Sequence, residues 1–167
     1  MSSELIVRDF EARDIAPACA LTNHFIVHTT VHFGETPASE EDFAAAWERR
    51  DRRFPWVAAD IDGRFAGYCK AGRWRERDAY ARTVETGIYV APEARRTGVA
   101  SALYGVLLGR LKLGGFRVVV AGITMPNEPS VRLHEALGFR HVGTFHAVGY
   151  KFAAWHDVGF WELDLGD

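Results

Sequence analysis

The sequence predicts one mixed α/β domain spanning residues 1–167, and two patterns support that prediction. Residues 83–121 contain a strand pattern, an amphipathic helix pattern and a second strand pattern, which is typical of two parallel strands joined by a right-handed crossover. Residues 56–69 contain two apolar runs flanking Asp62-Gly63, a turn pair typical of an antiparallel hairpin. The chain is therefore expected to contain both an antiparallel and a parallel pair of strands.

The first half of the chain is expected to contain one further strand and two helices. The strand lies at residues 5–7, and a helix follows from near Asp14, whose side chain can cap it, to about Val27. A second helix is expected to begin at Ser39, because the acidic residues of its first turn suit the helix dipole, and to end near Arg53. The hairpin strands come next, followed by a charged, aromatic loop at residues 72–80.

The second half of the chain carries the crossover and three short elements. Residues 83–90 alternate between two faces, as a strand does, and the helix at residues 98–113 has an apolar stripe made of Val99, Leu103, Leu107 and Leu111. Residues 118–121 are continuously apolar, as in a strand covered on both faces. The remaining elements are a short helix at residues 129–137 and strands near residues 142–145 and 158–165.

Composition and charge exclude several classes of protein. The hydrophobic content of 48% and charged content of 25% are those of a globular chain, not a disordered one. Twenty basic and 22 acidic residues leave a net charge of −2, so no basic field favours nucleic acid. No segment approaches the ~20 apolar residues of a membrane span, and the first residues lack signal-peptide features, so a cytoplasmic location is expected. Cys19 and Cys69 are too few for a disulfide framework or a thiolate metal site and are expected to be free, buried thiols.

The most informative segment joins the strand at residues 83–90 to the helix that follows it: Arg95-Arg96-Thr97-Gly98-Val99-Ala100. Small residues let a ligand approach the backbone, and the free N–H groups of the first helical turn suit an anion such as a pyrophosphate. A glycine-rich turn before a helix is also common as a purely structural element. The spacing matches neither the three-glycine dinucleotide fingerprint nor the Gly-Lys-Ser/Thr phosphate loop.

The pattern Arg-x-x-Gly-x-Ala after a strand resembles the acetyl-CoA pyrophosphate motif of the GNAT N-acetyltransferase superfamily. Further segments resemble the branch that acetylates phosphinothricin and methionine sulfoximine, among them Thr83-Val84-Glu85, Pro129-Ser130-Val131-Arg132-Leu133-His134-Glu135-Ala136-Leu137-Gly138-Phe139 and Trp155-His156-Asp157-Val158-Gly159-Phe160-Trp161. The resemblance runs along nearly the whole chain in order. It implies a splayed, mixed but mostly antiparallel sheet of about seven strands with about four helices, and acetyl-CoA lying in the splay.

The resemblance also implies which residues hold acetyl-CoA, the expected co-substrate. The backbone of Ile88, Tyr89 and Val90 is expected to hold the acetyl and pantetheine part. Asn127 is expected near the sulfur, and His134 stands where many members have a tyrosine that protonates the leaving thiolate. The pyrophosphate is expected at the glycine-rich turn, formed by Arg95, Arg96, Thr97, Gly98, Val99, Ala100 and Ser101.

Glu85 is the candidate general base. An amine attacks a thioester only as the free base, and a carboxylate on the central strand can remove its proton directly or through water. Gly87, two residues further on, suggests a β-bulge whose freed N–H groups bind the acetyl oxygen. Thr86 and Gly87 are expected beside the substrate. The alternative is that Glu85 is an ordinary strand carboxylate.

The loop Arg73-Trp74-Arg75-Glu76-Arg77 is the candidate for recognising an anionic substrate, because guanidinium groups pair with carboxylate or phosphinate oxygens. Charged runs are also often plain solvated loops. Phosphinothricin enzymes commonly carry Gly-Pro-Trp-Lys-Ala-Arg here, so Glu76 replaces a small residue, which affects side-chain specificity and not the reaction class. Phe33 and Trp74 are expected either to wall the substrate pocket or to lie in the core.

No metal site is expected. His24, His28 and His32 are spaced as on one helix face, but no cysteine or acid cluster completes a ligand set, so a polar helix face is the preferred interpretation. By analogy with this branch we expect a homodimer, to which the strand at residues 158–165 contributes as an otherwise uncovered sheet edge.

The leading hypothesis is an acetyl-CoA-dependent N-acetyltransferase that acts on the α-amine of a small amino-acid-like acid. The branch suggests phosphinothricin, methionine sulfoximine or methionine sulfone as the substrate, with detoxification and herbicide resistance as the role. One alternative is acetylation of another amine: a polyamine, an aminoglycoside or a protein terminus. The other is a non-catalytic CoA-binding module.

Overall fold

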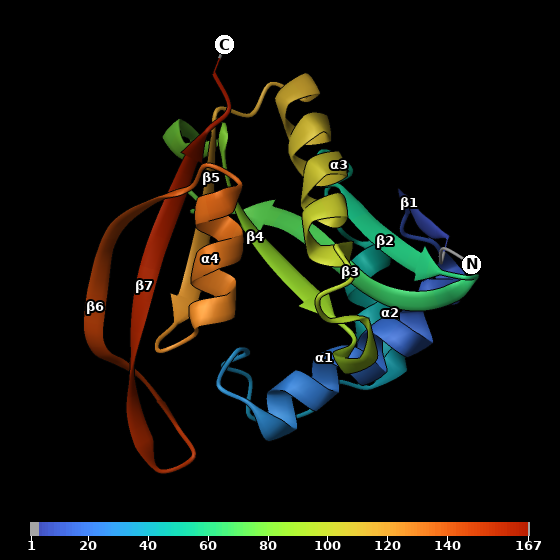
Figure 1. Cartoon of the computed structure of the whole chain (residues 1–167). Coiled ribbons are helices and arrows are strands. Elements are labelled where there is room, and N and C mark those ends of the chain that lie inside the picture. The colour runs from blue at the N-terminus through green and yellow to red at the C-terminus, as the bar shows by residue number, and fades with distance from the viewer. Residues whose placement is uncertain (1–3, 167) are drawn as a thin grey trace.

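The computed structural model describes residues 4–166, in which seven strands form one sheet of order β1-β2-β3-β4-β5-β7-β6 (Figure 1). Among the strands described, β4 and β5 pair in parallel and every other pair is antiparallel, so the predicted mixed, mostly antiparallel sheet is confirmed. The strands are β1 Leu5–Asp9, β2 Trp56–Ile61, β3 Arg64–Arg73, β4 Thr83–Val90, β5 Val118–Thr124, β6 Arg140–Lys151 and β7 Ala154–Asp164.

The α-helices are α1 Ile15–His28, α2 Glu40–Glu48, α3 Val99–Leu113 and α4 Glu128–Ala136. Two neighbouring residues of β3 show that α1 and α3 cover opposite faces of the sheet. The Tyr68 hydroxyl lies 2.6 Å from Thr22 Oγ1 of α1, whereas Cys69 Sγ lies 3.6 Å from the carbonyl oxygen of Leu103 in α3. Successive side chains of a strand point to opposite faces. No described helix is long and apolar enough to cross a membrane.

The core lies on both faces of the sheet. Beneath α1 and α2, the aromatic rings of Phe10, Phe43, Trp56 and Tyr68 pack with centroids 5.4–6.5 Å apart. Beneath α3, the predicted stripe is confirmed, because all four of its side chains are buried. Both cysteines are buried and free, as expected.

The sheet opens between β4 and β5. These strands pair only from Thr83 opposite Val118 to Glu85 opposite Val120, after which β5 continues along β7 while β4 continues along β3. Figure 1 shows the two strands diverging below their contact. The register between β3 and β4 is unbroken, with Gly87 opposite Lys70, so the bulge predicted at Gly87 is wrong. The splay, and not a bulge, leaves one backbone edge of residues 86–90 without a strand partner.

Two helix boundaries differ from the prediction, because the side chains of Asp14 and Asp51 form hydrogen bonds outside the helices. Asp14 does not cap α1; its carboxylate accepts hydrogen bonds from Arg8 and from the Glu11 N–H. Helix α2 ends at Glu48 and does not reach Arg53, since the Asp51 carboxylate and carbonyl oxygen accept the N–H groups of Arg53 and Phe54 in a turn.

The last two strands form a hairpin that is much longer than predicted (Figure 1). Most side chains of β6 are exposed on both faces, so the apolar alternation that reveals a strand is missing from its sequence. β7 lies between β5 and β6, and the expectation that residues 158–165 form an uncovered edge is therefore wrong. The edge at this end of the sheet is β6.

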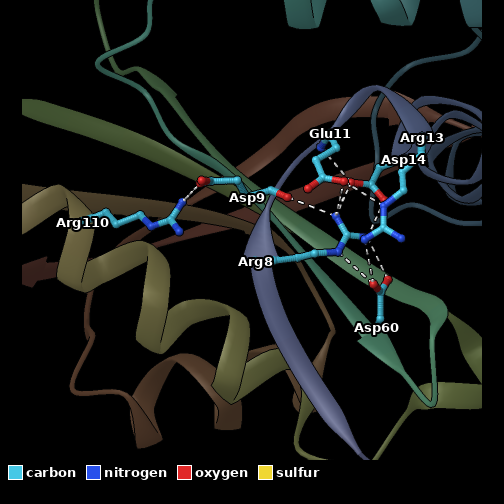
Figure 2. A network of polar contacts seen from close by, with 7 residues as sticks. All are labelled: Arg8, Asp9, Glu11, Arg13, Asp14, Asp60 and Arg110. Atoms are coloured by element: carbon cyan, nitrogen blue, oxygen red, sulfur yellow. Dashed lines mark hydrogen bonds and ion pairs between the residues drawn. The ribbon is translucent and has the colours of Figure 1, made fainter.

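A network of ion pairs connects β1 to β2 and to the short turn Ala12–Asp14 (Figure 2). The Arg8 guanidinium donates to Asp14 at 2.7 and 2.8 Å and to Asp60 at 2.8 and 2.9 Å. Asp14 and Asp60 are only 2% and 6% exposed, and the positive charge of Arg8 compensates the negative charges of these buried carboxylates. The same bonds raise the pKa of Arg8, with the Asp14 hydrogen bond contributing most.

Candidate active site

A cavity of about 570 Å³ lies in the splay between β4 and β5. It reaches both faces of the sheet, because its walls include Lys70 and Glu85 from the α1 side and Tyr104 and His134 from the α3 side. A ligand in this space can therefore contact both groups at once. The lining residues are Val31, His32, Arg50, Asp51, Phe54, Trp56, Lys70, Ala71, Gly72, Arg73, Glu85, Thr86, Gly87, Ile88, Tyr89, Tyr104, Ala121, Gly122, Ile123, Thr124, Asn127, Ser130 and His134.

Glu85 stands at the point where the two strands part. It is the last residue of β4 that pairs with β5, and its side chain is accessible from the cavity. Desolvation by the surrounding protein raises the pKa of the Glu85 carboxyl, while the positive charge of Arg75 acts in the opposite direction. A raised pKa improves a carboxylate as a proton acceptor.

A chain of hydrogen bonds joins β4 to α4 across the α3 side of the cavity. Thr86 Oγ1 lies 3.1 Å from the Tyr104 hydroxyl, which lies 2.9 Å from His134 Nε2. His134 Nδ1 lies 2.7 Å from the carbonyl oxygen of Ser130, which only accepts, so Nδ1 carries the proton and Nε2 accepts from Tyr104. Burial lowers the pKa of His134 and raises that of Tyr104.

Tyr104 was not among the residues that the sequence predicted for the site. Its place beside Leu103 in the buried face of α3 is the available signal, because a buried tyrosine hydroxyl normally needs a hydrogen-bond partner.

Asn127 and the free edge of β4 complete the cavity lining. Asn127 caps α4 through its Oδ1, which lies 3.3 Å from the Ser130 nitrogen, and it lines the cavity. Ile88 and Tyr89 also line the cavity, whereas Val90 lies beyond it at the end of β4. The structure thus brings Glu85, Thr86, Gly87, Ile88, Tyr89, Asn127 and His134 together around one space.

The glycine-rich turn lies outside this cavity, at the start of α3. Gly98 is the N-cap residue with φ of 85°, in the left-handed region that favours glycine. No side chain caps the helix, and its first hydrogen bond runs from the Ala102 N–H to the Gly98 carbonyl oxygen. The N–H groups before Ala102 therefore lie at an uncapped helix start. Arg95 and Arg96 are exposed beside them, which suits an anionic ligand.

The arginine loop contributes one residue, Arg73, to the cavity wall. Arg75 lies with its guanidinium carbon 4.5 Å from the centre of the Trp74 ring, and the Trp74 ring packs edge-on against Phe160 of β7. Trp74, Arg75, Glu76 and Arg77 do not line the cavity, although the charge of Arg75 acts on Glu85. Phe33 is 40% exposed and its ring centre lies 6.2 Å from that of His156, so it lies in neither the core nor the cavity wall.

Two polar residues on the α1 side of the cavity were not predicted for the site. Lys70 projects from β3, with Nζ 4.7 Å from the centre of the Trp56 ring. His32 was assigned to a helix face with His24 and His28, but α1 ends at His28 and His32 lies in the loop that follows. His32 Nδ1 accepts from the Gly34 N–H at 2.8 Å, so its proton is on Nε2. Desolvation lowers the pKa of both Lys70 and His32.

Lys151, at the end of β6, holds this wall in place. Its buried ammonium group donates to the carbonyl oxygens of Ile26, Thr29 and His32 at 2.5, 2.9 and 2.6 Å. A cation at a helix C-terminus also interacts favourably with the helix dipole. The β6–β7 hairpin thereby anchors the end of α1 and the loop that carries His32.

Within residues 4–166, no group of three or more histidine, cysteine, aspartate or glutamate side chains is arranged to hold a metal ion. The polar groups of the cavity are those of acid–base and anion-binding chemistry.

The sequence matches the family model "Acetyltransferase (GNAT) family" over residues 20–139. It is 45% identical to a phosphinothricin N-acetyltransferase of Streptomyces viridochromogenes, covering 95% of this chain and 87% of the relative. It is 34% identical to an L-methionine sulfoximine/L-methionine sulfone acetyltransferase of Pseudomonas aeruginosa, covering 95% and 94% of the two chains.

Solved structures are similar along almost the whole chain. A putative acetyltransferase from Salmonella typhimurium with its cofactor acetyl-CoA superposes with a TM-score of 0.94 at 30% identity, covering 98% of this chain and 95% of that one. A GNAT superfamily phosphinothricin acetyltransferase from Sinorhizobium meliloti in complex with AcCoA gives 0.92 at 35% identity, covering 99% and 90%.

Proposed function

The chain belongs to the GNAT acetyltransferase family, and we propose that it transfers the acetyl group of acetyl-CoA to the α-amine of a small amino-acid-like acid. The observation that carries this proposal is one cavity, in the splay of the sheet, that has Glu85 on one side and the Tyr104–His134 pair on the other. The named relatives act on phosphinothricin or on methionine sulfoximine and methionine sulfone, so these are the first substrates to consider.

Three features of this chain fit acetyl-CoA as the co-substrate. The unpaired edge of β4 around Ile88 and Tyr89 offers backbone groups to an extended pantetheine arm. Asn127 lines the cavity at the start of α4, where the family resemblance implies the sulfur end of the co-substrate. The uncapped start of α3 at Gly98 and the exposed Arg95 and Arg96 suit the pyrophosphate. Bound there, acetyl-CoA supplies an acetyl carbon activated as a thioester.

Glu85 acts as the general base. The substrate amine has to lose a proton before or as its nitrogen attacks the acetyl carbon, and Glu85 takes that proton directly or through water. As the C–N bond forms, the electron pair of the C=O π bond moves onto the acetyl oxygen. When that pair re-forms the C=O bond, the C–S bond breaks and its electron pair leaves with sulfur. Unpaired N–H groups along the free edge of β4 stabilise the negative charge that develops on the acetyl oxygen.

The Tyr104–His134 pair delivers a proton to the sulfur that leaves. When its imidazole is charged, His134 donates its Nε2–H to the Tyr104 oxygen, and the Tyr104 hydroxyl passes its own proton to the sulfur. Since burial lowers the pKa of His134, the charged donor is scarce at neutral pH and solvent shares this role. His134 is therefore expected to matter less for turnover than Glu85.

Cationic side chains around the cavity favour an anionic substrate. Lys70, Arg73 and Arg50 line it, and the charge of Arg75 acts on Glu85. Of the two carboxylates in the lining, that of Asp51 is paired with Arg53, which leaves Glu85. The acidic first turn of α2, from Glu40 to Asp42, lies outside the cavity lining and gives a polyamine or aminoglycoside no binding site there. A non-catalytic CoA-binding module would have no use for a base and a proton donor on opposite walls.

We also propose a cytoplasmic homodimer in which β6, as the free edge of the sheet, faces a second copy of the chain. The β6–β7 hairpin exposes six large apolar side chains, and an apolar strand edge of this length is normally covered. They are Val142, Phe145, Val148, Tyr150, Phe152 and Trp155. Light scattering that gives the mass of one chain at micromolar concentration would contradict the dimer.

A thiol-release assay tests the proposed function. The enzyme is given acetyl-CoA with phosphinothricin, methionine sulfoximine, methionine sulfone, spermidine, an aminoglycoside or a short peptide. We expect release of CoA with one or more of the three amino acids and little with the cationic amines. Turnover of only the cationic amines, or of none, would contradict the proposal.

A further inference from the structure

Lys70 lines the cavity and forms no ion pair with the carboxylates of Asp51 and Glu85 that line it too. Among residues 4–166, its ammonium group makes no hydrogen bond and no ion pair, and it lies over the face of the Trp56 ring. That contact attracts the charge but accepts none of the three N–H donors in a hydrogen bond. A partly buried ammonium group with unused donors is a natural partner for an anionic group of a ligand.

His32 adds a second donor to the same wall. Its Nδ1 is occupied by the Gly34 N–H, so its Nε2 proton is available in the cavity. Desolvation and, after it, the charges of Lys70 and Lys151 lower the His32 pKa, which keeps the imidazole neutral and in this donor form. The bond from Lys151 to the His32 carbonyl oxygen fixes the loop that presents the ring.

The register of the sheet relates Lys70 to Glu85. Lys70 lies opposite Gly87 and Glu85 lies opposite Gly72, so the two residues are diagonal neighbours on β3 and β4 and share one face of the sheet. Diagonal neighbours have Cα atoms about 7–8 Å apart. A small molecule between these side chains meets a proton acceptor at one end and a cation at the other, and an α-amino acid carries the matching amine and carboxylate.

We propose that Lys70, assisted by the Nε2–H group of His32, binds the carboxylate of the amino-acid substrate and so directs the α-amine toward Glu85. This inference rests on the proposed function and names a specificity-determining residue for it. The sequence had placed anion recognition on the arginine loop, whose Arg75 and Arg77 lie outside the cavity lining. In this arrangement Lys70, and not Arg75 or Arg77 of the loop, recognises the carboxylate inside the cavity.

Calorimetric binding to the protein saturated with CoA tests the inference without requiring turnover. The two probes are L-methionine sulfone and its carboxamide, which differ only in the anionic group. Lys70→Met keeps the aliphatic stem and removes the charge, Lys70→Arg keeps the charge, and Lys112→Met changes an exposed lysine at the end of α3 as the matched control.

We expect Lys70→Met to weaken binding of the acid about 10- to 100-fold, as loss of a hydrogen bond to a charged group implies, and to leave the amide unchanged. Lys70→Arg is expected to recover most of the affinity, and Lys112→Met to behave as the parent. Equal losses for acid and amide, or no preference of the parent for the acid, would overturn the carboxylate site.

Failure of the proposed function has a different signature. If the acid binds through Lys70 and yet no thiol is released with acetyl-CoA, the carboxylate site stands and the proposed reaction fails. If thiol is released from the acid and Lys70→Met binds it as well as the parent does, the reaction stands and the carboxylate site is overturned.

Discussion

The Tyr104 hydroxyl lies 2.9 Å from His134 Nε2, and this contact directs the Nε2 atom of the imidazole toward Tyr104. Since His134 Nδ1 donates to the Ser130 carbonyl oxygen, Nε2 of the neutral ring carries no proton and accepts a hydrogen bond from the Tyr104 hydroxyl. A histidine held this way donates a proton through Tyr104 to a thiolate only after it has been charged. The pair is therefore one unit in which neither residue acts without the other.

We expect His134→Phe to reduce turnover by less than ~10², because solvent supplies the missing proton in part. Tyr104→Phe is expected to give a loss of similar size, and the double variant little more than either single one. The imidazolium form exists only below the lowered pKa of His134, so the advantage of the parent over His134→Phe should shrink as the pH rises. Additive losses in single-turnover measurements would argue against a coupled pair.

Gly98 and Gly115 offer a matched test of the pyrophosphate site. Both have left-handed φ angles, 85° and 79°, and in both cases an added Cβ would meet no atom within 4 Å. Aspartate at either position thus brings the same backbone strain, but only Gly98 is at the N-terminus of α3. We expect Gly98→Asp to weaken acetyl-CoA binding at least tenfold through charge repulsion and Gly115→Asp to leave it unchanged. Equal acetyl-CoA affinities in the two folded variants would show that the pyrophosphate does not bind at this turn.

Lys151 is expected to support both stability and substrate binding. Lys151→Met deletes three hydrogen bonds from a charged donor and leaves three carbonyl oxygens near the end of α1 without it. We expect the free energy of unfolding to fall by about 3 kcal/mol and the KM for the amine to rise, with acetyl-CoA affinity unchanged. Urea unfolding and steady-state kinetics check this, with Lys112→Met as the control. A Lys151→Met variant with the stability and KM of the parent would show that Lys151 does not hold the end of α1 and the following loop in place.

The Arg8 network in Figure 2 makes a prediction about stability alone. Arg8→Met leaves the buried carboxylates of Asp14 and Asp60 without their main partner, which is expected to cost about 3–5 kcal/mol. Breaking the exposed Arg132–Glu128 pair on α4 by Arg132→Met is expected to cost less than ~1 kcal/mol, because solvent screens it. Similar urea midpoints for the two variants would mean that the buried network is no stronger than a surface pair.

Local patterns were sufficient for the elements and for part of the site. The strand at residues 83–90 and the helix after it are visible in alternation and in the apolar stripe, and the family resemblance then points to Glu85 and His134. The remaining residues depend on contacts that no local pattern contains. Lys151 reaches Ile26, 125 residues away, and the splay that opens the cavity comes from β5 leaving β4 for β7.

Two of the wrong sequence interpretations have related causes. Gly87 was interpreted as a bulge because glycine often marks one, but unbroken pairing with β3 holds it in register. His32 has the spacing of a helix face, but α1 ends at His28, and the loop beyond it is held by Lys151 from β6. Lys70 and Tyr104 were missed because an isolated lysine or tyrosine in an apolar element looks the same whether it packs or binds.

The pH dependence of thiol release by the parent and by Glu85→Gln, at saturating acetyl-CoA, tests the central claim most directly. Glu85 accepts a proton only when ionised, and burial raises its pKa above the ordinary value for a glutamate, so turnover of the parent should rise with pH through that raised pKa. Glu85→Gln keeps the shape of the side chain, and its turnover is expected to fall by ~10²–10⁴ and to lose this rise, with acetyl-CoA binding intact. Turnover near that of the parent, with the same rise, would contradict Glu85 as the base.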